Sequence, residues 1–204
     1  MIKKNIVIGS GGHSRSLISI LIKNKKNKIN IRSYAKLISK KKIFNIKVQK
    51  LNLELDLKGN NNYFLAIGDI KIRKKYFDIL KEKNKNTPNV ISKSSNLTIK
   101  INLGKANFIG ENVFIGPYTS IGSNNIINTL CSIDHECILG NHCNLSPGVI
   151  LGGRVKIEDK VFIGMGACIA DNVKIGKNVI IGANSFVNKS IENPGMYYGN
   201  PLRK

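Results

Sequence analysis

Residues 150–187 read ILGGRVKIEDKVFIGMGACIADNVKIGKNVIIGANSFV, and an aliphatic residue recurs in this stretch at every sixth position. The same period extends without interruption from residue 97 to residue 187. Neither the 3.6-residue period of an α-helix nor the two-residue alternation of an ordinary strand produces this pattern. A six-residue period is typical of a β-solenoid, in which each repeat packs only against its neighbours. The aliphatic positions are Leu97, Leu103, Ile109, Ile115, Ile121, Ile127, Ile133, Leu139, Leu145, Leu151, Ile157, Ile163, Ile169, Ile175, Ile181 and Val187.

The six-residue repeat predicts a triangular coil, with one short strand and one corner for each hexad. Three hexads close a turn of about eighteen residues, and stacked turns bury a continuous column of aliphatic side chains. A small or β-branched residue four positions after each aliphatic one, such as Val113 or Cys131, fills the space beside the corner. An ordinary sandwich of short strands would show variable turn lengths instead. The pattern breaks near residue 90, which predicts two domains, residues 1–90 and 91–204.

The amino-terminal domain reads as a small Rossmann-like α/β unit. Residues 4–8 predict a buried strand, and the turn Gly9-Ser10-Gly11-Gly12-His13 leads into a helix from Ser14 to about Asn24. Further strands are expected at 29–33, near 46–48 and at 63–69, where the last ends in Gly68-Asp69, with a helix over 70–83. A glycine turn before a helix N-terminus favours an anionic ligand. Because Ser14 replaces the third fingerprint glycine and 29–33 carries no acidic residue, we expect a phosphate-bearing molecule other than NAD.

The net charge of +21 is concentrated in the amino-terminal half. Residues 1–95 hold 23 Lys+Arg against 5 Asp+Glu, a charge of +18, and residues 96–204 hold 10 against 7, a charge of +3. The lysines are mixed with Asn and Ile and lack an aromatic-rich motif, so a solvated surface is a better explanation than a nucleic-acid partner. No apolar run approaches the roughly 20 residues of a membrane span. We therefore expect a cytoplasmic protein with no membrane partner.

The four cysteines all lie in the repeat. Cys131, Cys137 and Cys143 are six residues apart at the small inward position, so they occupy successive faces of the coil and cannot converge on a metal. They are expected to be buried packing thiols, with no disulfide framework and no metal site. The same inward placement argues against a cysteine nucleophile.

Of the three histidines, His135 has the surroundings that general-base chemistry requires. His142 is expected at the surface, and for His13 a structural role in the glycine turn and substrate contact are equally open. His135 stands at a corner between Asp134 and Glu136, and a neighbouring carboxylate can fix its tautomer and raise its basicity. On spacing alone, a functional and a structural reading of His135 both remain open.

The hexapeptide coil resembles left-handed β-helix acyltransferases. The combination of GSGGH (9–13), YFLAIGDIKIRKK (63–75), IDHECILGNHCNLSPGVILGG (133–153) and YYGNPLRK (197–204) is similar to one subfamily of sugar N- and O-acetyltransferases. This subfamily includes nucleotide-amino-sugar N-acetyltransferases of the PglD type and sialic acid O-acetyltransferases of the NeuD type. The resemblance implies an α/β domain followed by a left-handed parallel β-helix, assembled as a homotrimer with active sites between subunits.

The resemblance also implies roles for individual residues. His135 would be the catalytic base supported by Glu136, and a nucleotide-linked sugar would bind the glycine turn and the AIG segment. Acetyl-CoA would lie between adjacent subunits, with an oxyanion held by the N–H groups near Gly152 and Gly153. Asn144 replaces a second histidine of the family, and Arg32-Ser33-Tyr34 replace an acidic pair. The substrate-binding residues would be Gly9, Ser10, Gly11, Gly12, His13, Gly68 and Asp69, and the acetyl-CoA-binding residues Asn144, Gly152, Gly153, Met165, Gly166, Ala183 and Pro201, with the 201–204 tail beside the adenine.

The expected activity is acetyl-CoA-dependent N-acetylation of the 4-amino group of a UDP- or dTDP-linked 4-amino-4,6-dideoxy sugar, in surface glycan or O-antigen biosynthesis. His135 would take a proton from the sugar amine while the amine attacks the acetyl carbonyl of acetyl-CoA directly, so that no acyl-enzyme forms. One alternative is O-acetylation of sialic acid or a related sugar, with the same base and coenzyme. A different class is a non-catalytic hexapeptide scaffold, against which the His135-Glu136 pair argues.

Overall fold

The computed structural model describes residues 3–35 and 41–201. The chain divides into two compact units, Met1–Val90 and Ile91–Lys204. Within the described residues, no helix is both long and apolar enough to cross a membrane.

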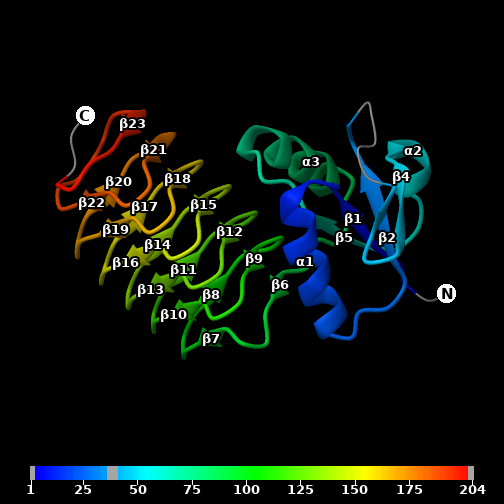
Figure 1. Cartoon of the computed structure of the whole chain (residues 1–204), viewed down its shortest axis with the longest axis horizontal. Coiled ribbons are helices and arrows are strands. Elements are labelled where there is room, and N and C mark those ends of the chain that lie inside the picture. Colours follow the sequence, from blue (N-terminus) through cyan, green and yellow to red (C-terminus); the bar gives the residue numbers. More distant parts are fainter. Residues whose placement is uncertain (1–2, 36–40, 202–204) are drawn as a thin grey trace. The chain divides into compact units, whose positions relative to one another are not determined.

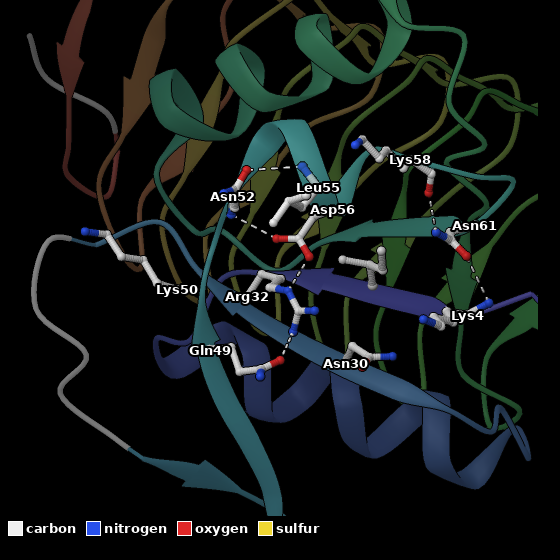
Figure 2. A pocket seen from close by; sticks show the side chains of 11 residues that line it. Lys4, Asn30, Arg32, Gln49, Lys50, Asn52, Leu55, Asp56, Lys58 and Asn61 are labelled. Carbon is white, nitrogen blue, oxygen red and sulfur yellow. Dashed lines mark hydrogen bonds and ion pairs between the residues drawn. The ribbon is translucent and has the colours of Figure 1, made fainter.

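The amino-terminal unit is a five-stranded sheet with helices on both faces. The strands lie in the order β3-β4-β2-β1-β5, and all pair in parallel except β3 with β4. Figure 1 and Figure 2 show α1 on one face of the sheet and α2 on the other. The elements are β1 (Asn5–Ile8), α1 (Gly12–Lys23), β2 (Ile29–Ser33), β3 (Lys42–Ile43), β4 (Ile46–Lys50), α2 (Leu53–Asp56), β5 (Asn62–Leu65) and α3 (Ile70–Glu82).

The central strands of the sheet are apolar on both faces, and helices cover both. Ile6, Ile8 and Tyr63 are buried on one face in a cluster that includes Leu80 of α3. Val7 alternates with them and is also fully buried. Fully buried parallel strands of this kind read as continuous apolar runs, which is the pattern that predicted β1.

Two element boundaries differ from the sequence-based expectation. Helix α1 begins at Gly12 rather than Ser14, so His13 lies in the first helical turn and not in the loop before it. Strand β5 ends at Leu65, so Gly68 and Asp69 belong to the loop before α3. Asp69 caps that helix, because its carboxylate accepts the N–H of Ile72 at 2.8 Å.

The second unit is a left-handed parallel β-helix whose three flat faces are parallel sheets (Figure 1). The first sheet contains β7 (Asn96–Leu97), β10 (Phe114–Ile115), β13 (Ser132–Ile133), β16 (Ile150–Leu151), β19 (Cys168–Ile169) and β22 (Phe186–Val187). The second sheet contains β8 (Asn102–Leu103), β11 (Ser120–Ile121), β14 (Ile138–Leu139), β17 (Lys156–Ile157) and β20 (Lys174–Ile175). The third sheet contains β6 (Val90–Ile91), β9 (Phe108–Ile109), β12 (Ile126–Ile127), β15 (Asn144–Leu145), β18 (Phe162–Ile163), β21 (Val179–Ile181) and β23 (Gly195–Tyr197).

Each coil takes eighteen residues, as the repeat predicts. Ile133 pairs with Ile115 of the preceding coil and with Leu151 of the next, and the same register recurs on all three sheets. The aliphatic positions form one continuous buried cluster along the axis. The cysteines pack into it as expected, since Cys131, Cys137 and Cys143 are buried.

The corners turn on residues three positions after each aliphatic one. Glu136, Arg154 and Asn172 have φ values of 58°, 59° and 61°, in the left-handed region that L-residues rarely adopt. The glycine that follows many aliphatic residues has another purpose: a Cβ on Gly116 would lie 2.7 Å from the backbone carbon of Asp134 in the next coil. The corner glycines therefore allow the coils to stack closely.

The surface position expected for His142 is wrong. Its side chain is buried, and Nδ1 lies 2.8 Å from Nδ2 of Asn124, which is also buried. The two residues occupy the same corner position in successive coils, eighteen residues apart, so the ring stacks along the coil axis instead of projecting outward.

Candidate active site

His135 lies at the corner that joins the first sheet to the second. Strand β13 ends at Ile133, and β14 begins at Ile138. The side chain of Asp134 accepts the N–H of His135 at 2.7 Å, which holds the backbone at the start of the corner. This corner presents the imidazole at the surface, where 39% of its side chain is exposed.

Glu136 contacts the histidine ring directly. Its Oε2 lies 2.9 Å from Nδ1 of His135. A carboxylate in this position accepts a hydrogen bond from Nδ1–H, and the neutral ring then carries its lone pair on Nε2. The geometry therefore orients Nε2 as the nitrogen that can take up a proton.

Gly153 lies beside the imidazole, one coil further along. A Cβ at this position would come within 2.7 Å of Nε2 and 2.8 Å of Cε1 of His135. A side chain at residue 153 would therefore displace the imidazole ring of His135. The sequence predicted Gly153 to be a coenzyme contact, whereas the structure places it against the imidazole of His135.

The oxyanion role expected for the amides of Gly152 and Gly153 does not fit this arrangement. The N–H of Gly152 donates to the carbonyl of Ile169 at 2.9 Å, and the N–H of Gly153 donates to Oδ1 of Asp171 at 3.0 Å. Both donors are already bonded to the next coil. An oxyanion at this corner would need other donors.

A pocket of about 400 Å³ lies on the second sheet of the β-helix, next to this corner. A larger pocket, of about 460 Å³, lies on the amino-terminal unit. The smaller pocket is lined by the Glu136 carboxylate, by Arg154, which lies 3.5 Å from that carboxylate, and by two further cations, Lys156 and Lys174. The two lysines leave the pocket with a net positive charge, which favours an anionic group beside His135.

The remaining residues expected to bind acetyl-CoA lie elsewhere on the β-helix. Asn144 belongs to β15 of the third sheet and is buried. Met165, Gly166 and Ala183 lie at the corner between the third and first sheets, where the Met165 side chain is exposed. One chain therefore does not gather these residues around His135. Pro201 is exposed, and residues 202–204 of the expected tail lie outside the described part of the chain.

Two of the cysteines in the β-helix have thiol pKa values too high for a nucleophile at neutral pH. Burial raises the pKa of both Cys131 and Cys137 to about 11. Their sulfur atoms donate to carbonyls of the next coil, that of Cys131 to Ser146 and that of Cys137 to Gly152, each at 3.1 Å. Among the described residues, no group of three or more His, Cys, Asp or Glu side chains has the arrangement of a metal site.

In the amino-terminal unit, the expected substrate residues come together at the carboxyl ends of β1 and β5. Gly9 has φ 124°, and a Cβ there would lie 2.3 Å from the carbonyl oxygen of Ala66. The glycine turn therefore packs directly on the segment that leads to Gly68. The hydroxyl of Ser10 donates to that of Ser33 at 3.0 Å and ties the turn to the end of β2.

The N-terminus of α1 opens from this turn with Gly11 as its capping residue and no acidic side chain in the first turn. Such an end favours an anion. Burial, followed by the nearby charge of Arg73, lowers the pKa of His13 to about 4, so His13 is neutral at physiological pH. Arg73 itself is buried, and its Nη1 donates to the carbonyls of Ile67 and Gly68 at 3.1 Å each. In the sequence, Arg73 looks like one more basic residue of a lysine-rich helix, and no signal there distinguishes it from its neighbours.

The larger pocket lies on the α2 face of the sheet (Figure 2), and none of the expected site residues lines it. The polar side chains that line this pocket bond to one another. Nε of Arg32 lies 2.5 Å from Oδ1 of Asp56, and Nη1 of Arg32 donates to Oε1 of Gln49 at 2.6 Å. Asn52 caps α2 through the N–H groups of Glu54 and Leu55. These contacts fasten α2 to the sheet, so we read the pocket as a consequence of that attachment.

Family models match both units. Residues 4–80 match the PglD N-terminal domain, and residues 154–189 match the bacterial transferase hexapeptide repeats. The chain belongs to the PglD-type hexapeptide-repeat family of sugar acetyltransferases. No curated protein sequence is significantly similar to it.

Solved structures agree with this family across the whole chain. PerB from Caulobacter crescentus, solved in complex with CoA and GDP-perosamine, is 28% identical with a TM-score of 0.91 and aligns over 100% of this chain and 97% of its own. The acetyltransferase domain of PglB from Neisseria gonorrhoeae is 21% identical with a TM-score of 0.91, over 99% of both chains. WeeI from Acinetobacter baumannii is 21% identical with a TM-score of 0.85, again over 99% of both chains. The last two establish likeness of fold alone.

Proposed function

We propose that this protein transfers the acetyl group of acetyl-CoA to the 4-amino group of a nucleotide-linked 4-amino-4,6-dideoxy sugar. The observation that carries the proposal is the contact between Nδ1 of His135 and Oε2 of Glu136, which leaves Nε2 to act as a general base. The likeness to PerB, whose structure contains CoA and GDP-perosamine, supports the coenzyme and the class of acceptor.

In the proposed reaction, the neutral sugar amine attacks the carbonyl carbon of the thioester. The new C–N bond forms as Nε2 of His135 takes the amine proton and the C–S bond breaks. The imidazolium then gives this proton to the departing thiolate, which leaves as free coenzyme A and returns His135 to its neutral form. Glu136 stabilises the imidazolium that forms. A cysteine nucleophile is not needed, and the raised pKa values of Cys131 and Cys137 argue against one.

We further propose that the amino-terminal unit recognises the nucleoside diphosphate of the sugar substrate through the glycine turn and the N-terminus of α1. Ser10, Gly11, Gly12 and neutral His13 would contact the ligand, beside Gly68 and Asp69. The absence of acidic side chains from the first turn of α1 supports this assignment.

A homotrimer is part of the proposal, with active sites between subunits. The support is that Asn144, Met165 and His135 lie on different faces or corners of one β-helix, so that coenzyme contacts and base would meet only across neighbouring copies. Because both proposed substrates are cytoplasmic metabolites, we assign the reaction to the cytoplasm and to the assembly of surface glycans.

The test is release of free coenzyme A thiol from acetyl-CoA with GDP-, UDP- and dTDP-linked 4-amino-4,6-dideoxy sugars, in parallel with sialic acid. Wild-type turnover with an amino sugar, lost in His135→Ala, supports the proposal. Turnover with sialic acid alone would replace it with O-acetylation. Absence of turnover, together with absence of CoA binding by calorimetry, would favour a non-catalytic scaffold.

A further inference from the structure

Three residues at one corner of the β-helix form a column beside the base. Glu136, Arg154 and Asn172 are eighteen residues apart, and all three have the left-handed corner conformation. The N–H of Arg154 donates to the carbonyl of His135, and the N–H of Asn172 donates to that of Gly153, each at 2.9 Å. Successive members of the column are therefore separated by one strand spacing, about 4.8 Å, so their side chains are neighbours.

The side chains of the column are connected end to end. Nε of Arg154 donates to Oδ1 of Asn172 at 2.9 Å. Nη1 of the same guanidinium lies 3.5 Å from Oε2 of Glu136. That carboxylate oxygen is also the one that contacts Nδ1 of His135 at 2.9 Å. The Arg154 guanidinium therefore contacts Asn172 through Nε and Glu136 through Nη1.

The Glu136 carboxylate needs such support because it is exposed. Its side chain is 52% exposed, and an isolated contact between exposed neighbours contributes little against the freedom of a flexible side chain. A planar guanidinium with several donors in fixed directions can restrict that freedom in a way that an ammonium cannot. Arg154 is in turn restricted by its bond to Asn172.

On the basis of the proposed function, we propose that Arg154 is a positioning residue. Anchored by Asn172, it holds Oε2 of Glu136 against Nδ1 of His135 and so keeps Nε2 directed at the acceptor amine. Its effect on the reaction passes through Glu136, and it does not bind the substrate.

A double-mutant cycle separates these roles. Arg154→Gln is expected to lower kcat about tenfold, part of the 10²–10⁴-fold that a general base supplies, with the KM for acetyl-CoA and acceptor unchanged. In a Glu136→Gln background, the same substitution should change kcat by less than about twofold, because there is no carboxylate left to position. Lys160→Gln is the matched control, since it removes a cation from the next corner and should leave kcat unchanged. Additive losses, or a raised KM with kcat unchanged, would overturn the proposal and assign Arg154 to substrate binding.

A second readout does not depend on turnover. Ring ¹⁵N spectra of the neutral histidines, with His135 assigned by its loss in His135→Ala, should show Nδ1–H as the dominant tautomer in the wild type and in Lys160→Gln. Arg154→Gln should show a mixture of tautomers at unchanged thermal stability. An unaltered spectrum in Arg154→Gln refutes the positioning role. A wild type that shows the Nδ1–H tautomer but no turnover with any acceptor refutes the proposed function alone.

Discussion

The imidazole of His135 lies against Gly153 of the next coil, where a Cβ would come within 2.7 Å of Nε2. The two residues are eighteen positions apart, which is one turn of the β-helix, so the register of the coil sets this contact. The nitrogen proposed to accept the substrate proton is therefore the atom most sensitive to a side chain at residue 153.

Gly153→Ala is expected to displace the imidazole and lower kcat by at least about tenfold, since general-base catalysis depends on sub-ångström placement. Gly153 does not have a positive φ, so alanine causes no backbone strain and the melting temperature should change little. The control is the same substitution in a His135→Ala background, where it should cause no additional loss of thiol release. Wild-type kcat in Gly153→Ala would contradict the placement of Nε2.

Removal of the coil thiols should reduce stability and leave catalysis intact. With a pKa of about 11, only about one in ten thousand Cys131 or Cys137 thiols is ionised at pH 7. Cys131→Ala and Cys137→Ala should each lose about 1 to 2 kcal/mol of unfolding free energy through the cavity they create, while kcat is retained. Chemical denaturation and the thiol-release assay measure the two effects separately. Loss of kcat in a folded Cys137→Ala protein would restore the cysteine nucleophile.

Titration of His13 should make the amino-terminal unit less stable in mild acid. The folded-state pKa of about 4 lies below the ordinary histidine pKa of 6.5, so the unfolded chain binds more protons between these limits. The stabilisation by neutral His13 is complete above pH 6.5 and is lost as the pH falls toward 4, to a total on the order of 3 kcal/mol.

His13→Gln should therefore lose less unfolding free energy than the wild type when the pH is lowered from 7.5 to 5. Denaturant unfolding followed by circular dichroism at the two pH values provides the comparison. Equal losses in both proteins would show that burial does not suppress the charge on His13.

The ion pair between Arg32 and Asp56 should contribute more to stability than an exposed pair. Their side chains are 16% and 9% exposed, whereas those of Lys74 and Asp78 on α3 are 37% and 50% exposed. Arg32→Met leaves the largely buried Asp56 carboxylate of α2 without its cation and should lower the unfolding free energy by about 2 kcal/mol. Lys74→Met, the matched surface control, should lower it by less than about 0.5 kcal/mol. Equal effects of the two substitutions would show that α2 is not fastened through this pair.

The expectations that proved wrong have a common cause. His142 was placed at the surface because corner residues were expected to project outward, but Asn124 lies one coil below and the ring stacks on it. The amides of Gly152 and Gly153 were expected to be available, yet they bond to Ile169 and Asp171 of the next coil. Each error concerns contacts between successive coils, which a single hexad does not reveal.

The β-helix, the eighteen-residue coil and the break near residue 90 could all be predicted from the sequence, because an aliphatic residue recurs at every sixth position and must be buried. The His135-Glu136 pair could be predicted as well, since the two residues are adjacent. The tertiary structure alone decided the surroundings of that pair: the space left by Gly153, the contact of Arg154 with Glu136 and its anchor on Asn172. The physical reason is that stacking the coils brings together residues eighteen positions apart, while the left-handed corner conformation and the side-chain rotamers decide which of their atoms meet.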